Sequence, residues 1–132
     1  MDIVIDTSAI IAVILGEGTK EDLLNLTKGA NLIAPHSIHW EIGNAFSRLF
    51  KQKRITLEEA KSAYHFYQTI QIKFVDISME SALEMAEQLN IYAYDAYLIS
   101  CAISSNAPLI SLDNGLIQAA KHLNIEVLEV DS

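Results

Sequence analysis

The chain has 132 residues, of which 51% are hydrophobic, five are glycine and two are proline. This composition excludes a largely disordered chain and predicts a single domain spanning residues 1–132. One cysteine excludes an intrachain disulfide, and the longest uncharged apolar stretch, Ala9 to Leu15, is far shorter than the ~20 residues of a membrane span. We therefore expect a soluble, cytoplasmic protein with no membrane partner.

The net charge is −8, from 17 acidic against nine basic residues. This sign is unfavourable for a protein that coats nucleic acid by counterion release. It fits a cluster of metal-binding carboxylates, a basic partner or simple solubility. Because composition leaves all three open, the positions of the acidic residues in the chain have to decide.

Short apolar runs alternate with segments of helical periodicity along the whole chain. In chain order the pattern first predicts a strand over 3–5, a helix ending at Gly16, a helix that Thr19 caps and that runs to Leu26, and a strand over 31–34. Next come a helix over 37–52, a helix from the Thr56–Glu59 capping box to Thr69, and a strand over 72–75. The last part of the chain predicts a helix from the Ser78 cap to Leu89, a helix over 94–104, a strand over 108–110, a helix over 114–122 and a fifth strand over 125–128. This alternation predicts an α/β fold with a central, mostly parallel, five-stranded sheet flanked by helices.

Two carboxylates directly follow strands of this predicted sheet. Asp6 comes after the first strand, and Asp113 comes after the fourth. Ligands of open α/β sheets bind in the crevice outside the carboxyl ends of the strands, where both side chains would lie. The alternative is that each aspartate only caps the helix that follows it.

Two further carboxylates fall on the apolar faces of predicted helices. Glu41 lies between Ile38 and Ala45 on one helix, and Asp95 precedes Leu98 and Ile99 at helical spacing on another. An acid on a core-facing stripe is costly to bury unless it is paired or bound to metal. The alternatives are that Glu41 reaches solvent at the edge of its stripe and that Asp95 caps its helix.

If the four acids converge, their mutual repulsion raises pKa values and destabilises the fold, and divalent cations relieve it. An oxygen-only site without cysteine or histidine suits Mg²⁺ or Mn²⁺ rather than zinc. Such ions lower the pKa of a water molecule and offset charge on an attacked phosphate. The acids Asp6, Glu41, Asp95 and Asp113 therefore predict a metal-dependent site for phosphoryl chemistry.

Four segments in this order and spacing resemble the PIN domain family, and more narrowly the VapC-type toxins of toxin–antitoxin pairs. They are VIDTSAI with Asp6, HWEIGNAF with Glu41, YDAYLISCA with Asp95, and LISLDNGL with Asp113. The resemblance covers essentially the whole chain and implies that these four acids hold the metal and catalyse. By the same resemblance Ser8, Asn44 and Ser111 are supporting residues; Ser111 stands where the family more commonly has threonine.

The resemblance implies an Mg²⁺- or Mn²⁺-dependent endoribonuclease with an RNA substrate. It also implies a small antitoxin protein whose basic segment would occupy the acidic pocket, and a homodimer. Four of the nine basic residues are candidates for contacts with the RNA backbone, or simply complement a helix C-terminus: Arg48, Lys51, Lys53 and Arg54.

Two alternatives remain. One is a receiver-like phosphoacceptor domain with Asp76 as the acceptor, although Asp6 lacks an acidic neighbour after it and the last strand is not followed by a lysine. The other is a PIN fold that only binds a partner, which would have no need of four repelling acids. Asp76, after the third strand, is also a possible fifth ligand, or a turn residue.

Overall fold

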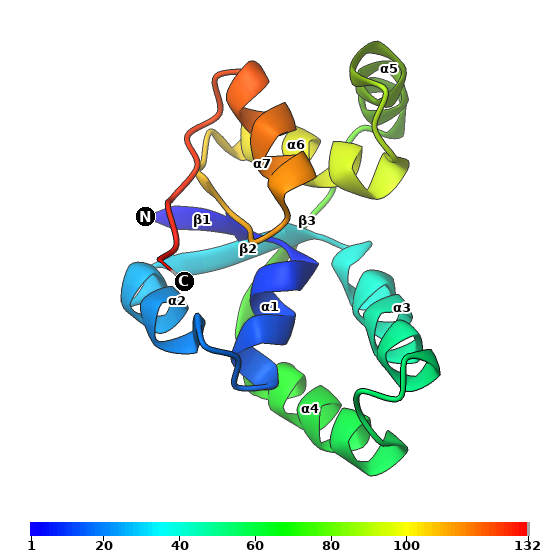
Figure 1. The fold of residues 1–132 in the computed structure, drawn as a ribbon. Helices are drawn as coiled ribbons and strands as arrows, with labels where there is room; N and C mark the ends of the chain where they lie inside the picture. The colour runs from blue at the N-terminus through cyan, green and yellow to red at the C-terminus, as the bar shows by residue number, and fades with distance from the viewer. Residues whose placement is uncertain (132) are drawn as a thin grey trace.

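The computed structural model describes residues 1–131, which form a parallel sheet between two groups of helices (Figure 1). The elements in chain order are β1 (Asp2–Ile5), α1 (Thr7–Ile14), α2 (Lys20–Thr27), β2 (Asn31–Pro35), α3 (Ile38–Lys51), α4 (Leu57–Thr69), β3 (Ile72–Val75), α5 (Met79–Leu89), α6 (Ala93–Ser105), β4 (Leu109–Ile110) and α7 (Asn114–His122). The α/β class with a parallel sheet is confirmed.

The strand order β3-β2-β1-β4 determines where a ligand site can form. Val4 of β1 pairs with Ile33 of β2 on one side and with Leu109 of β4 on the other, and all of these pairings are parallel. The chain therefore runs from β1 through β2 to β3 on one side, and the connection from β3 then crosses back to β4 on the other side of β1. The carboxyl ends of β1 and β4 form the switch point at which open α/β sheets bind ligands.

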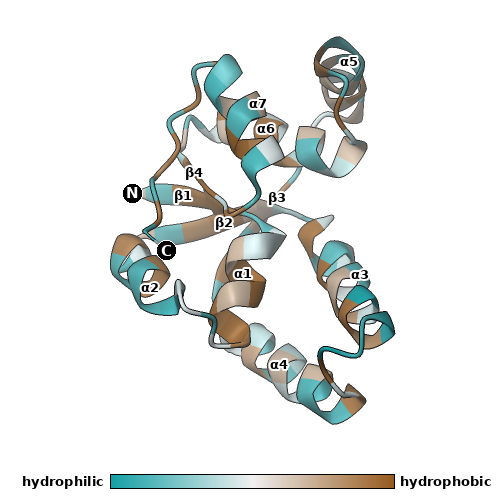
Figure 2. Ribbon diagram, viewed as in Figure 1, coloured by the Kyte–Doolittle hydropathy of each residue, from teal (hydrophilic) through white to brown (hydrophobic). Residues whose placement is uncertain are grey.

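The core lies on both faces of the sheet. Ile3, Val4 and Ile5 of β1 are at most 4% exposed, as expected for a strand covered on both sides. Helices α1–α4 lie on one side of the sheet and α5–α7 on the other (Figure 1). The inner strands are hydrophobic along most of their length, whereas the helices mix hydrophilic and hydrophobic residues (Figure 2).

Local capping signals account for several helix boundaries. The predicted box at α4 is present, because the Glu59 backbone N–H donates to Thr56 Oγ1 at 3.1 Å and the Thr56 N–H donates to Glu59 Oε1 at 3.0 Å. Ser78 caps α5 by accepting from the Ser81 N–H at 3.2 Å. Asn90 ends α5 in the left-handed conformation, at φ 54°.

Two sequence-based predictions were wrong. The described chain has four strands, and residues 125–128 contribute only an isolated parallel bridge from Val127 to Leu109. A second rung would need Ser111, which has already left β4. Thr19 precedes α2 but makes no capping hydrogen bond, since its backbone is helical (φ −83°, ψ −4°) rather than extended as an N-cap requires.

The longest helix within residues 1–131, α3, has 14 residues. None of the described helices is long and apolar enough to cross a bilayer.

Candidate active site

Asp6 occupies the centre of the site because β1 ends one residue before it and α1 begins one residue after it. The residue is only 3% exposed. Its carboxylate caps α1 by accepting from the Ala9 N–H at 3.0 Å, so the sequence-based capping interpretation is correct for Asp6. The Asp6 carboxylate does more than cap α1, since two side-chain hydroxyl groups also donate hydrogen bonds to it.

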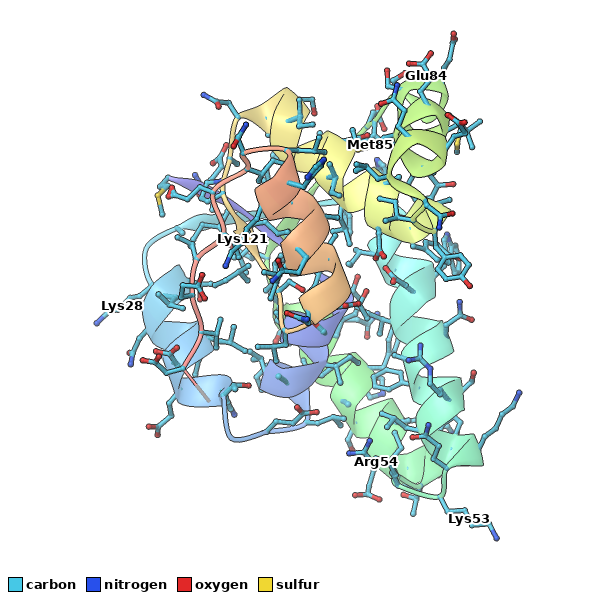
Figure 3. The ribbon with its side chains drawn as sticks, turned by 45° about the horizontal axis from the view of Figure 1, so that its top comes forward. Lys28, Lys53, Arg54, Glu84, Met85 and Lys121 are labelled. Carbon is cyan, nitrogen blue, oxygen red and sulfur yellow. The ribbon has the colours of Figure 1, made fainter. Side chains whose placement is uncertain are left out.

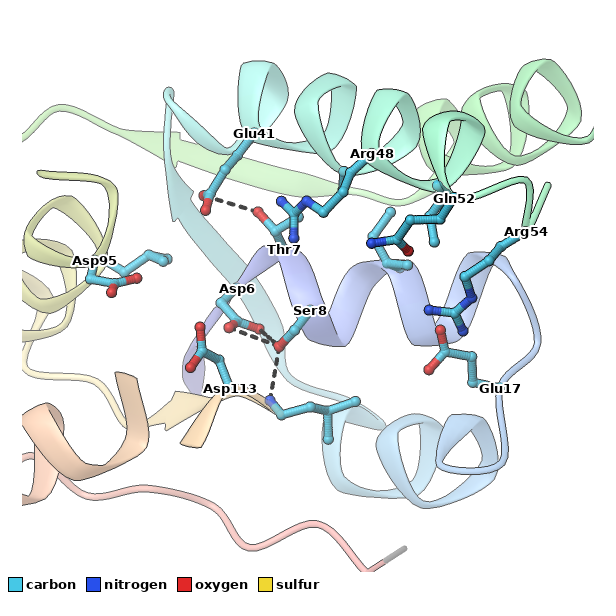
Figure 4. A pocket seen from close by; sticks show the side chains of 15 residues that line it. Asp6, Thr7, Ser8, Glu17, Glu41, Arg48, Gln52, Arg54, Asp95 and Asp113 are labelled. Carbon is cyan, nitrogen blue, oxygen red and sulfur yellow. Dashed lines mark hydrogen bonds between the residues drawn. The ribbon is translucent and has the colours of Figure 1, made fainter. Parts of the chain in front are cut away.

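Ser8 and Ser111 hold the Asp6 carboxylate between them. The Ser8 hydroxyl donates to both carboxylate oxygens, at 2.8 and 2.9 Å, and accepts from the Leu112 N–H at 2.9 Å (Figure 4). The Ser111 hydroxyl donates to Oδ2 at 2.5 Å and accepts from the Asp113 N–H at 2.9 Å. Both predicted supporting serines therefore link the end of β1 to the loop after β4.

Burial dominates the electrostatics of Asp6. Loss of solvent raises the pKa of its carboxyl from 3.8 to about 6, against the opposing effect of the hydrogen bonds from Ser111, Ala9 and Ser8. The nearby charge of Asp113 is a smaller contribution to the same rise. Asp6 is therefore mostly ionised at neutral pH, but it is readily protonated under mildly acidic conditions.

Asp113 reaches the same place from β4. It caps α7 by accepting from the Gly115 N–H at 2.9 Å and the Leu116 N–H at 3.4 Å, and the residue is exposed. The capping interpretation is thus correct for Asp113 as well. Because β1 and β4 are neighbours, these two N-caps bring their carboxylates to one edge of the sheet.

Glu41 approaches from α3, with Ile38 and Ile42 of the same helix buried beneath it. The Thr7 hydroxyl donates to Glu41 Oε2 at 3.0 Å and ties α3 to the first turn of α1. Burial raises the pKa of Glu41; the hydrogen bond from Thr7 lowers it, and the charges of the other three acids raise it.

Asp95 lies in the first turn of α6, opposite Glu41 (Figure 4). It is not the cap of this helix, because the N-cap position falls on Tyr92 and carries no capping hydrogen bond. Burial raises the pKa of Asp95, and the charge of Asp113 raises it further. The carboxylate therefore faces the other acids rather than the end of its own helix.

All four predicted acids line one cavity of about 450 Å³. Its polar lining consists of carboxylates, hydroxyls, one amide and two guanidiniums, with no imidazole or thiol among the lining residues. Within residues 1–131 no three acidic, histidine or cysteine side chains already meet around a single ion position. The donor set nevertheless fits Mg²⁺ or Mn²⁺, since Mg²⁺ keeps several waters and takes only one or two carboxylates directly.

The structure brings some of the other candidates to this cavity and leaves others outside. Arg48 and Arg54 line it, whereas Lys51 and Lys53 are exposed and do not. Asn44 is also exposed and outside the lining.

Asp76 lies apart from the four acids. His36 Nε2 contacts its carboxylate at 3.0 Å, and both side chains line a separate hollow beyond the ends of β2 and β3. A fifth-ligand role for Asp76 has no geometric support, and neither does a receiver-like phosphoacceptor built on it.

Three polar lining residues were not identified from the sequence: Thr7, Glu17 and Gln52. A threonine at a helix start and polar residues just past helix ends are ordinary surface features. The one sequence signal for Thr7 is its place in the DTS motif that directly follows a buried strand.

The fold and the acid-lined cavity define an α/β domain with a carboxylate site at its topological switch point. The model of the PIN domain family matches residues 3–122, and the chain belongs to this family. No curated protein sequence matches the chain.

Solved structures share the fold at low sequence identity. The crystal structure of VapBC2 from Rickettsia felis, bound to a DNA fragment from its promoter, matches with a TM-score of 0.72 at 18% identity, over 99% of this chain and 100% of that one. PAE2754 from Pyrobaculum aerophilum matches with a TM-score of 0.69 at 17% identity, over 90% and 79% of the two chains. Mycobacterium tuberculosis VapC20, described as a sarcin–ricin loop cleaving toxin, matches with a TM-score of 0.64 at 14% identity, over 89% and 94%.

Proposed function

We propose that this chain is a metal-dependent endoribonuclease, the toxin of a toxin–antitoxin pair. The observation that carries the proposal is that Asp6, Glu41, Asp95 and Asp113, from four distant segments, line one cavity at the switch point of the sheet. Membership of the PIN family and the shared fold of the VapBC2 and VapC20 structures support the same activity.

Bound Mg²⁺ or Mn²⁺ would lower the pKa of a water molecule and offset the charge of the attacked phosphate. The chain itself supplies orientation. Ser8 and Ser111 hold the Asp6 carboxylate in place, and Thr7 holds Glu41, so that oxygen donors face the cavity without having to reorganise. Arg48 and Arg54 supply positive charge for the RNA backbone in the same cavity.

The test compares single amide substitutions in purified protein. Asp6→Asn and Asp95→Asn each remove one cavity carboxylate, whereas the control Asp76→Asn removes a carboxylate that lies after a strand but outside the cavity. We expect the first two variants to lose more RNA cleavage activity than the roughly 10- to 100-fold that is typical when only a hydrogen-bonding partner of a metal ligand is replaced. Asp76→Asn should match wild type, and EDTA should abolish cleavage in all of them.

The outcomes separate the alternatives. Wild-type activity in Asp6→Asn would show that the cleavage comes from a contaminant or another site. RNA binding by wild type without cleavage in Mg²⁺ or Mn²⁺ would instead favour a PIN fold that serves only as a binding module.

We also propose a small antitoxin with a basic segment as the partner of this cytoplasmic toxin. The net charge of −8 and the acidic cavity favour a cationic segment. An apolar groove lies between α1 and α4, lined by Leu15 and Phe66 with Glu58 and Glu59 at its side. This groove would suit an antitoxin segment that is amphipathic as well as cationic. Salt-insensitive binding of a basic amphipathic peptide would contradict this proposal.

A homodimer is proposed on the exposed apolar side chains of α3 and α5. Trp40 is 70% exposed, Met79 52% and Leu83 55%, which is unusual for side chains of this size. A monomer mass by light scattering at micromolar concentration would contradict it.

A further inference from the structure

The cavity has a second end that the four acids do not occupy. Gln52 and Arg54 line it from the end of α3 and the turn that follows, and Glu17 lines it from the turn after α1; Arg48 lies between the two ends (Figure 4). Figure 4 shows the Arg54 guanidinium and the Glu17 carboxylate facing each other, away from the acidic end. The cavity therefore runs from a carboxylate cluster, past Arg48, to the Arg54 guanidinium, which one further carboxylate opposes.

The same helix-ending motif places Glu17 and Arg54. After α1 the Gly16 N–H donates to Val13 O at 3.2 Å and the Glu17 N–H to Ala12 O at 2.8 Å. These two bonds define a Schellman motif, with Gly16 in the left-handed conformation at φ 68°.

After α3 the Lys53 N–H donates to Phe50 O and the Arg54 N–H to Leu49 O, both at 2.9 Å, with Lys53 at φ 57°. The residue after the left-handed position commonly makes an apolar contact with the preceding turn in this motif. Here both of those positions carry charges instead, and the charges face each other across the cavity.

The spacing along α3 suits a nucleic-acid backbone. Arg48 follows Glu41 by seven residues, or about 10 Å along the helix axis at ~1.5 Å per residue. A phosphate held by Arg54, beyond Arg48, would therefore belong to a nucleotide next to the one at the acidic end. Guanidinium groups are well suited to this task because their planar donors match phosphate oxygens.

Glu17 opposes such binding. Among residues 1–131 no ion pair within 4.0 Å includes Arg48 or Arg54, so neither guanidinium is locked by a carboxylate. Glu17 nevertheless faces Arg54 (Figure 4) and attracts its guanidinium away from an approaching phosphate. The Arg54 guanidinium can therefore be attracted either to the Glu17 carboxylate or to an RNA phosphate.

We propose that Glu17 restrains RNA binding by competing with a backbone phosphate for Arg54. This inference rests on the proposed function, since it takes RNA as the ligand of the cavity. Glu17 is a positioning residue here: it acts through Arg54 and has no part in bond cleavage. RNA contact with Arg54 requires the guanidinium to turn from Glu17 toward the phosphate.

The test measures binding of a short fluorescein-labelled single-stranded RNA by anisotropy in EDTA, where cleavage cannot occur. We expect Glu17→Gln to tighten binding about two- to fivefold, the range of an exposed charge pair. The slope of log K against log salt should steepen by about 0.7, for one added phosphate contact. Arg54→Gln should weaken binding, and adding Glu17→Gln to it should have no further effect.

A matched control separates this contact from the change in net charge. Glu21 is exposed and lies outside the cavity lining, so Glu21→Gln should leave RNA affinity unchanged. Unchanged affinity in Glu17→Gln, or the same tightening in the Arg54→Gln background, would overturn the inference. Wild type that binds RNA but fails to cleave it with Mg²⁺ or Mn²⁺ would overturn the proposed function alone, because the binding comparison does not depend on cleavage.

Discussion

Asp6 carries a buried charge whose effect on stability depends on pH. Its folded-state pKa is raised from 3.8 to about 6, so the folded protein binds the proton more tightly than the unfolded chain. The resulting stabilisation is fully present below the unfolded pKa and is lost as pH rises through the folded one. A rise of this size corresponds to roughly 3 kcal/mol.

We therefore expect the free energy of unfolding, measured with urea in EDTA, to fall between about pH 4 and pH 7. Asp6→Asn lacks this carboxyl, so its unfolding free energy should fall less over the same range. Glu41 and Asp95, whose pKa values are also raised, contribute a remaining decline in both proteins. Parallel pH profiles for the two proteins would show that Asp6 is not buried as a charge.

Single residues could be predicted where they broke a local rule. Glu41 and Asp95 stood out because acids are unexpected on apolar helix faces, and both line the cavity. Asn44 could not be placed in the same way. It lies about 60° around the helix from Glu41, and Ala45, nearer the direction of Glu41, lines the cavity instead. Thr7 obeys every local rule, so its bond to Glu41 becomes visible only when α1 and α3 are packed.

At the scale of the element, the ends of α1 and α3 share one backbone motif but differ in the residue at its left-handed position. Both end in a Schellman motif, but the left-handed position is glycine in the first and Lys53 in the second, at φ 57°. A residue with a Cβ pays a steric penalty of about 1–2 kcal/mol in this conformation, which glycine avoids. Replacement by glycine stabilises the fold by less than this penalty, because glycine also increases the conformational entropy of the unfolded chain.

Lys53→Gly should therefore raise the free energy of unfolding by roughly 0.5–1 kcal/mol. Lys53→Ala is the matched control, since it removes the same amine but keeps the Cβ, and it should be no more stable than wild type. Lys53 projects away from the molecule (Figure 3), so loss of its amine should not disturb packing. Equal stability of the two variants in urea unfolding would contradict the strain argument.

Elements with their own signals were predictable, and an element that depends on a neighbour was not. The box at Thr56 and the cap at Ser78 involve contacts within a single turn, and both are present. Residues 125–128 have an apolar pattern that suits a strand, but a strand needs a partner of sufficient length. Since β4 consists of only Leu109 and Ile110, one bridge is formed and pairing stops.

At the scale of the whole molecule, the parallel order β3-β2-β1-β4 turns four separate segments into one site. The sequence predicted a parallel sheet and acids at the ends of its first and fourth strands. It contained no local signal that these two strands are neighbours, which is what brings Asp113 to Asp6. Pairing between strands more than 100 residues apart in sequence follows from global packing. In advance, the family resemblance implied only that the four acids form one metal site.

This convergence predicts a response of the entire fold to metal. Four carboxylates around one cavity repel one another, and a divalent cation that binds only the folded state stabilises it by about 2.7 kcal/mol at 100 times its dissociation constant. We expect saturating Mg²⁺ or Mn²⁺ to raise the melting temperature by several degrees, and KCl of equal ionic strength to do much less. Asp95→Asn should lose most of the shift, and Asp76→Asn should keep it. A shift that KCl reproduces, or that Asp95→Asn retains in full, would mean that metal acts by general screening of the −8 charge.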